Sequence, residues 1–121
     1  MTQCNHEAFS FSNCRKRQVK GNFFGEPISS NGGSLLLREV DRRMGLTMAV
    51  ARALGEQRQR GKVRHDVATM VRQRVHAIAL GYEDLNDHDA LRDDLVVQTA
   101  CERDGSLASS STLCRFEQRA E

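Results

Sequence analysis

From residue 34 onward, the spacing of apolar residues along the chain predicts helices. In Ser34–Met44, apolar side chains recur every fourth residue at Leu36, Val40 and Met44, which is the spacing of one helical stripe. We expect this stripe to face the core and the charged residues between, including Arg38, to face solvent.

The longest helix predicted by the pattern is Val67–Leu80, with Asp66 as its N-cap. A shorter helix, Met48–Leu54 with Thr47 as its cap, should precede it. The long helix is the expected centre of the core, because one broad face carries Val67, Met70, Val71, Val75, Ile78 and Ala79. An aspartate at Val71 or Ile78 should therefore place an unpaired charge in the core and unfold the protein.

After Gly81, which suits a helix end, the chain enters an acidic corner that we define as Glu83–Asp94. Asn86 and Asp87 should cap the next helix there. Helical segments are expected at Asp87–Arg92 and Leu95–Cys101, with Leu91, Leu95, Val96 and Ala100 buried.

A last helix should start within Ser109–Thr112, where Glu117 is spaced for a reciprocal capping contact. Two interpretations of this helix are open. It is either the second helix of a helix-turn-helix DNA reader, with Arg115 and Arg119 outward, or a helix that packs against the others.

The first 33 residues lack the helical pattern, and short extended segments are predicted at Ala8–Ser12 and Val19–Phe24. Two short strands are marginal alone, so if the arm is ordered in a longer full-length protein we expect it to join a sheet from elsewhere in that protein. The predicted fold class is all-α: a small multi-helix domain at residues 34–121 with an irregular or short-stranded N-terminal arm at residues 1–33.

The net charge of the whole chain is only +2, but the charges are segregated. A block rich in basic residues, Arg52–Arg74, which we call the basic block, precedes the acidic corner. Long cationic side chains can displace counterions from a DNA backbone, whereas a solvated basic surface is the alternative interpretation. The candidate DNA contacts are Arg58, Arg60, Lys62, Arg64, Arg72 and Arg74, together with Arg15, Lys16, Arg17 and Lys20 of the arm.

Neither candidate metal site has a recognised ligand spacing. Asp84, Asp87, His88 and Asp89 fit neither a calcium loop nor a helical zinc pair, and Cys4, His6 and Cys14 include no C-x-x-C pair. We therefore predict no metal and no other cofactor for this chain.

The sequence has neither an apolar run long enough for a membrane span nor a secretory signal at its start. We expect a cytoplasmic protein that does not enter membranes. Its cysteines, Cys4, Cys14, Cys101 and Cys114, should be free thiols in that compartment.

Four segments, Ile28–Leu46, Val63–Asp66, Arg72–Asp94 and Ser111–Glu117, resemble in order the amino-terminal region of bacterial insertion-sequence DDE transposases. The resemblance is to the insertion-sequence thirteen-eighty group, related to the insertion-sequence-four clan. It implies DNA transposition, in which three acidic residues on a ribonuclease-H-like sheet hold two divalent metals such as Mg²⁺. In the family that sheet follows the region matched here.

The resemblance implies a truncated transposase, an N-terminal fragment that binds DNA at element ends and supports assembly, with self-association as a further expectation. None of the family's catalytic acids has a counterpart here, so we expect no enzyme activity and no cleavage of DNA with magnesium or manganese. Two alternatives are a free-standing helical interaction or regulatory module and a small metal-dependent enzyme using the acidic corner.

Overall fold

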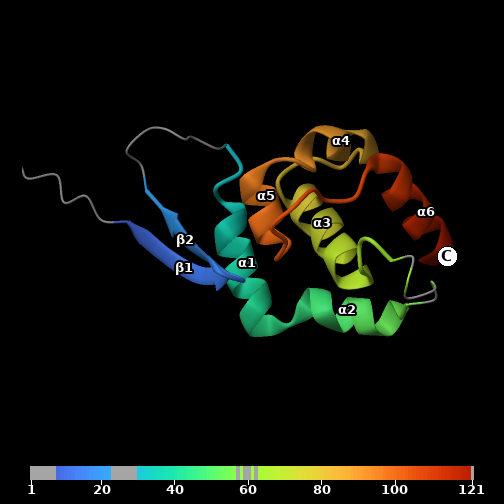
Figure 1. Cartoon of the computed structure of the whole chain (residues 1–121), viewed down its shortest axis with the longest axis horizontal. Coiled ribbons are helices and arrows are strands. Elements are labelled where there is room, and N and C mark those ends of the chain that lie inside the picture. The colour runs from blue at the N-terminus through green and yellow to red at the C-terminus, as the bar shows by residue number, and fades with distance from the viewer. Residues whose placement is uncertain (1–7, 23–29, 57, 59–60, 62, 121) are drawn as a thin grey trace, which may run out of the picture.

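The computed structural model describes residues 8–22, 30–56, 58, 61 and 63–120 (Figure 1). Helices follow one another from Ser34 onward, as the apolar pattern predicted. They are α1 (Ser34–Met44), α2 (Leu46–Leu54), α3 (Val67–Ala79), the 3₁₀ turn η2 (Leu85–Asp87), α4 (His88–Leu91), α5 (Leu95–Ala100) and α6 (Ser110–Ala120).

The N-terminal arm forms a two-stranded antiparallel hairpin. Strand β1 (Phe9–Cys14) pairs with β2 (Arg17–Gly21), so that Phe11 lies opposite Val19. The fold is therefore helical with a small sheet rather than purely α. The C-terminal part of the predicted second strand, residues 23 and 24, lies outside the described residues.

Helix α1 holds the hairpin against the helical part of the molecule. The carboxylate of Glu39 accepts from the Ser12 backbone N–H at 2.6 Å and from the Ser12 hydroxyl at 2.8 Å. These bonds hold the pKa of Glu39 below its usual value. The hairpin lies beside α1, on the side of the molecule away from α6 (Figure 1).

Helix α3 is central, as predicted, because it contributes to all three apolar clusters of the core. Val67, Met70 and Val71 are buried. The predicted face is wrong towards the C-terminal end, where Val75 and Ile78 are 39% and 53% exposed and Ala79 is also exposed.

Three other residues of α3, Gln73, His76 and Ala77, take those core positions. Gln73 donates to the Ala108 carbonyl at 2.8 Å and accepts from the Ala108 N–H at 3.1 Å, and its amide nitrogen lies 3.2 Å from Nδ1 of His88. Because Gln73 bonds to polar groups on other elements, the C-terminal end of α3 buries the side that carries Gln73 and exposes its apolar stripe.

Helix α1 spans the predicted residues but faces the opposite way. Leu36, Val40 and Met44 are 63%, 50% and 69% exposed, whereas Arg38 is 1% exposed. Arg38 is buried because it donates to Glu102 and to backbone carbonyls of β1. The predicted core stripe is therefore a surface feature.

Helix ends are partly as predicted. Asp66 accepts from the Thr69 N–H at 2.7 Å and caps α3. Helix α2 begins at Leu46, so Thr47 lies inside it rather than at its cap, buried and bonded to Asp41. In the acidic corner Asp84 caps η2 by accepting from the Asn86 N–H at 2.9 Å, and Asp87 is the N-cap residue of α4, as predicted, but without a side-chain capping bond.

The buried residues of α5 differ from the prediction, and α6 packs on the core through two apolar side chains. In α5, Leu95 is 66% exposed instead of buried as predicted, and Val97 is fully buried. Helix α6 packs through Leu113 and Phe116 and exposes Arg115 and Arg119, which is compatible with both interpretations of this helix. Its Glu117 pairs with Arg74 of α3 instead of with its own cap.

Among the helices described, none is long and apolar enough to cross a bilayer. Of the described cysteines, Cys14, Cys101 and Cys114 are free thiols, and the first two are buried. Burial raises the pKa of the Cys14 and Cys101 thiols, so neither is an activated nucleophile.

Candidate nucleic-acid interface

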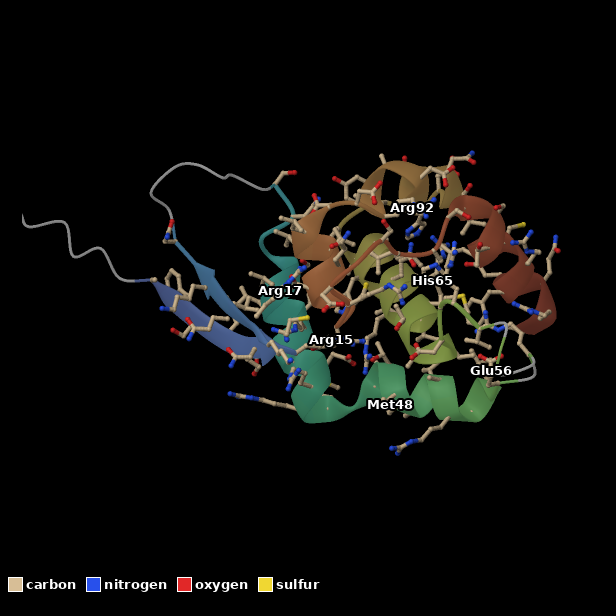
Figure 2. The ribbon with its side chains drawn as sticks, viewed as in Figure 1. Arg15, Arg17, Met48, Glu56, His65 and Arg92 are labelled. Atoms are coloured by element: carbon tan, nitrogen blue, oxygen red, sulfur yellow. The ribbon has the colours of Figure 1, made fainter. Side chains whose placement is uncertain are left out.

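A groove of about 430 Å³ opens where α1 ends and α2 begins. Three arginines from three helices line it: Arg42 of α1, Arg52 of α2 and Arg72 of α3. We call this feature the arginine groove. Its remaining lining includes Met48, which Figure 2 labels on α2, and the carboxylates Asp41 and Glu102.

A sharp corner at Gly45 brings the three arginines to one place. Gly45 has a φ of 69°, in the left-handed region that favours glycine, and it separates α1 from α2 without a longer loop. Ala51 of α2 then packs on Val67 and Val71 of α3. That packing holds α2 against the helix that carries Arg72.

Both carboxylates in the groove are already engaged by neighbouring residues. Asp41 accepts from the Thr47 N–H at 2.9 Å and from its hydroxyl at 2.5 Å. Glu102 accepts from Arg38 at 2.7 and 2.9 Å and from Arg42 at 2.9 Å. Burial by itself would raise the pKa of Glu102, but the hydrogen bonds from the two arginines outweigh it and lower that pKa.

Two arginines of the groove have donors available. Within the described part of the chain, neither Arg52 nor Arg72 makes a hydrogen bond or an ion pair. Arg52 is exposed and Arg72 is half-buried. Since guanidinium groups bind phosphate oxygens in paired, charge-assisted hydrogen bonds, the groove is suited to a phosphate group.

Two of the predicted DNA contacts are held in internal ion pairs. Arg58 pairs with Glu56 at 2.6 Å and donates to the His65 carbonyl at 2.6 Å, and the hydrogen bond from Arg58 lowers the pKa of Glu56 to about 2. Arg74 pairs with Glu117 at 2.5 Å and lies 3.2 Å from Nε2 of His88. Binding phosphate would require these arginines to leave their partners.

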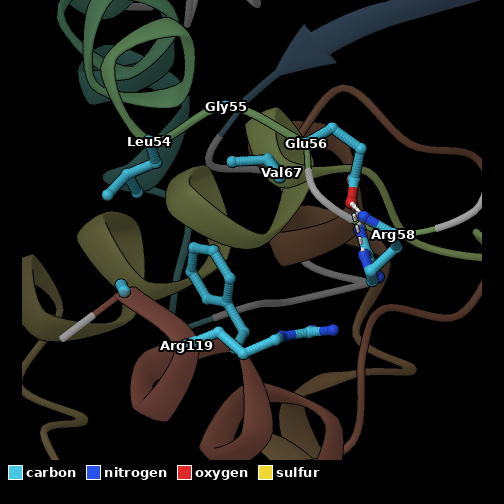
Figure 3. Close-up of a pocket in the computed structure, with 8 residues that line it drawn as sticks. Leu54, Gly55, Glu56, Arg58, Val67 and Arg119 are labelled. Atoms are coloured by element: carbon cyan, nitrogen blue, oxygen red, sulfur yellow. Dashed lines mark hydrogen bonds and ion pairs between the residues drawn. The ribbon is translucent and has the colours of Figure 1, made fainter.

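Figure 3 shows Arg58 joined to Glu56 beside a small cavity, which Leu54, Val67 and Arg119 also line. The cavity measures about 40 Å³, which is room for little more than a few water molecules. This second hollow is therefore not a nucleotide site.

The other predicted contacts lie on several surfaces. Arg64, Lys16 and Lys20 are exposed, whereas residues 60 and 62 lie outside those that the structure describes. Arg15 lies 4.0 Å from the Asp104 carboxylate, and Arg17 donates to the Asp104 carbonyl at 3.2 Å.

Asp104 lies two residues after the groove's Glu102. The labelled Arg15 and Arg17 lie at the hairpin end that adjoins α1 (Figure 2). The basic hairpin turn and the arginine groove therefore border the same segment, 102–104.

Of the three groove arginines, Arg72 alone was among the predicted contacts. Arg42 and Arg52 lie ten residues apart on either side of Gly45, and a tight corner between two helices is the sequence feature that could have linked them. Arg72 is twenty residues further on, so its meeting with them depends on how α2 packs against α3.

The acidic corner serves to tie elements together. Asp89 accepts from the Ser110 N–H at 2.9 Å and from its hydroxyl at 2.7 Å, which lowers the pKa of Asp89. Asp94 accepts from two backbone N–H groups at the start of α5. His88 is buried, and its ring nitrogens lie 3.2 Å from the Gln73 amide nitrogen and 3.2 Å from the Arg74 guanidinium. Over the described ranges, no three His, Cys, Asp or Glu side chains gather as a metal site, and residues 4 and 6 lie outside those ranges.

Comparison with known proteins gives one match. The family model described as transposase DDE domain group 1 matches residues 11–121, which include every helix described above and the hairpin from Phe11 onward. The search of curated proteins found no match, and neither did the search of solved structures. Since the match covers most of the sequence, the chain belongs to the group 1 family of transposase DDE domains.

Proposed function

We propose that this chain is the DNA-contacting N-terminal part of a transposase of the insertion-sequence thirteen-eighty group, acting in the cytoplasm in transposition and assembly at element ends. The family match over residues 11–121 supports a transposase origin. The observation that carries the DNA contact is the arginine groove. It offers two guanidinium groups, Arg52 and Arg72, that have no partner among the described residues, beside a third, Arg42.

In this proposal the groove receives a phosphate of the DNA backbone, and the basic hairpin turn contacts a neighbouring phosphate. The exposed Lys16, Lys20 and Arg64 add charge, as do residues 60 and 62. Such contacts position the protein without reading the bases, so binding should be largely independent of sequence and weaken steeply with salt.

In this proposal Arg58 and Arg74 have a structural role. Their ion pairs to Glu56 and Glu117 shape the loop after α2 and the packing of α6 on α3. We expect them to support the surface on which DNA lies and to add to its positive potential, with smaller effects on the salt dependence than the groove arginines.

We further propose that the chain alone does not cleave or join DNA. The corner residues Asp84, Asp89 and Asp94 already accept hydrogen bonds from backbone N–H groups. Carboxylates held in this way are not arranged around a pair of metal ions, which transposase chemistry of this type requires.

The experiment is a DNA titration of the whole chain at several salt concentrations. In the double variant Arg52→Gln/Arg72→Gln, the slope of log affinity against log salt should become shallower by about 1.8, since each phosphate that the protein no longer neutralises reduces it by about 0.9. Affinity at low salt should fall for all duplex sequences alike.

The matched control is Arg115→Gln/Arg119→Gln on α6, which removes the same charge from two exposed positions outside the arginine groove. It should leave the slope close to that of the unmodified chain. Equal slopes for both double variants would refute the groove as the contact, and a chain without salt-dependent DNA binding would refute the proposed function.

A further inference from the structure

Four apolar side chains of α1 face away from the core. Leu36, Val40 and Met44 are 63%, 50% and 69% exposed, and Leu37 is 39% exposed. They lie on one side of the helix, since residues three and four apart are neighbours on a helix surface. We call these four residues the α1 apolar face.

The helix cannot turn this face inward. The opposite side of α1 buries Arg38, whose guanidinium is held by both carboxylate oxygens of Glu102 and by the carbonyls of Ser12 and Asn13. Rotating α1 would strip a buried charge of all its partners, which costs more than exposing a few methyl groups. The outward orientation is therefore part of the fold.

The pattern on α1 is complementary to itself when two helices pack antiparallel about a two-fold axis at Val40. Residues equally far from Val40 in opposite directions then meet, so Val40 contacts Val40 of the second copy. Leu37 is three residues before the axis and Met44 is four residues after it. At about 1.5 Å per residue, Leu37 lies within about 2 Å of the level of Met44 in the second copy.

The charges beside the α1 apolar face favour the same arrangement. Arg43 and Glu39 lie on one flank of it, and over the described residues Arg43 has no hydrogen bond or ion pair. Antiparallel packing brings like flanks together and places Arg43 within about 3 Å along the axis of Glu39 in the second copy. Parallel packing about a two-fold axis would instead place the two Arg43–Glu39 flanks on opposite sides of the contact, so Arg43 would not meet Glu39 of the second copy.

From this self-complementarity we infer that the α1 apolar face binds a second copy of this chain in an antiparallel, two-fold contact. Four apolar residues per copy make a contact much smaller than the roughly 800 Å² per partner of a standard interface, so the dimer is weak and reversible. The inference does not depend on DNA binding, because the face is separate from Arg52 and Arg72.

Sedimentation velocity of the full chain over a concentration series tests this. The unmodified chain should shift reversibly from monomer to dimer as its concentration rises. Val40→Glu should raise the dissociation constant by about tenfold or more, because it places two carboxylates at the two-fold axis. Leu36→Gln, at an exposed position, should act in the same direction.

The matched control is Val75→Glu on α3, a valine of comparable exposure (39% against 50%) outside the face. It should dimerise like the unmodified chain. A chain that stays monomeric at every concentration would overturn the inference, whatever the variants do. A dimer that Val40→Glu and Leu36→Gln leave intact would overturn it as well.

Discussion

Replacing Arg38 by methionine is the most informative perturbation of this fold. The guanidinium is 1% exposed and donates to both oxygens of Glu102, at 2.7 and 2.9 Å, to the Asn13 carbonyl at 2.9 Å and to the Ser12 carbonyl. The substitution keeps an unbranched side chain in the site but removes every one of these donors. It therefore tests whether the ion pair orients α1.

The expected loss can be worked out from these contacts. Removing one partner of a buried ion pair costs about 3–5 kcal/mol, since the remaining charge is left without compensation. Glu102 is 19% exposed and keeps its bond to Arg42, which places the loss at the lower end, about 3 kcal/mol. Domains of this size are stable by roughly 5–15 kcal/mol, so the variant should fold but melt early.

Urea denaturation followed by circular dichroism measures this free energy of unfolding. Arg43→Met, the neighbouring exposed arginine, is the control and should change it by less than about 0.5 kcal/mol. In the double variant Arg38→Met/Glu102→Gln, part of the loss should be recovered, because the carboxylate no longer needs a partner. A loss below about 1 kcal/mol for Arg38→Met would refute the reasoning.

Two further predictions concern the core. Val71→Asp should abolish the cooperative urea transition, because it buries an unpaired charge. Ile78→Asp, at a 53% exposed site, should change the free energy of unfolding by less than about 0.5 kcal/mol. Similar effects of both variants would contradict the observed buried face of α3. Between about pH 7 and about pH 5 the free energy of unfolding should fall, because burial lowers the pKa of His65 to about 4 and also lowers those of His76 and His88. Below an unfolded pKa of 6.5 the unfolded chain then binds more protons than the folded one, and stability measured in urea at each pH should show that sign.

The elements that the sequence predicted well are those decided by local chemistry. Helix α1 ends at Gly45 in the left-handed conformation, and α3 begins at the cap formed by Asp66. Both depend on a residue and its nearest neighbours, so a pattern of a few positions suffices. The central place of α3 was also predictable, because its first turns are apolar enough to pack on several sides.

The orientation of α1 was not predictable from its own residues. Its apolar stripe indicates an amphipathic helix and the spacing of its faces, but not which face meets the core. That choice depends on Glu102, 64 positions away, and on backbone carbonyls of the N-terminal hairpin, 25 positions or more before Arg38. At the C-terminal end of α3 the cause is similar, since Gln73 is buried by its bonds to Ala108.

The sequence indicated that the candidate site is basic, but not which arginines form it. A basic block was visible, and Arg72 was chosen from it, but a run of cations does not reveal which of them find carboxylates in the fold. Arg58 and Arg74 do so at 2.6 and 2.5 Å, whereas Arg52 does not within the described residues. Arginines left without partners by the packing are better candidates for a phosphate contact than those closest together in sequence.

Glu102 connects the two surfaces proposed here. Its carboxylate holds Arg38, which turns the α1 apolar face outward, and Arg42, which forms one wall of the arginine groove. A buried ion pair of this kind contributes little net stability compared with apolar residues in place of both partners, so its main effect is to select the orientation of α1. An apolar residue at position 38 would remove the contact that fixes the orientation of α1, whereas Arg42 would keep its own hydrogen bond to Glu102. The same carboxylate therefore sets both the self-complementary helix and the geometry offered to a phosphate.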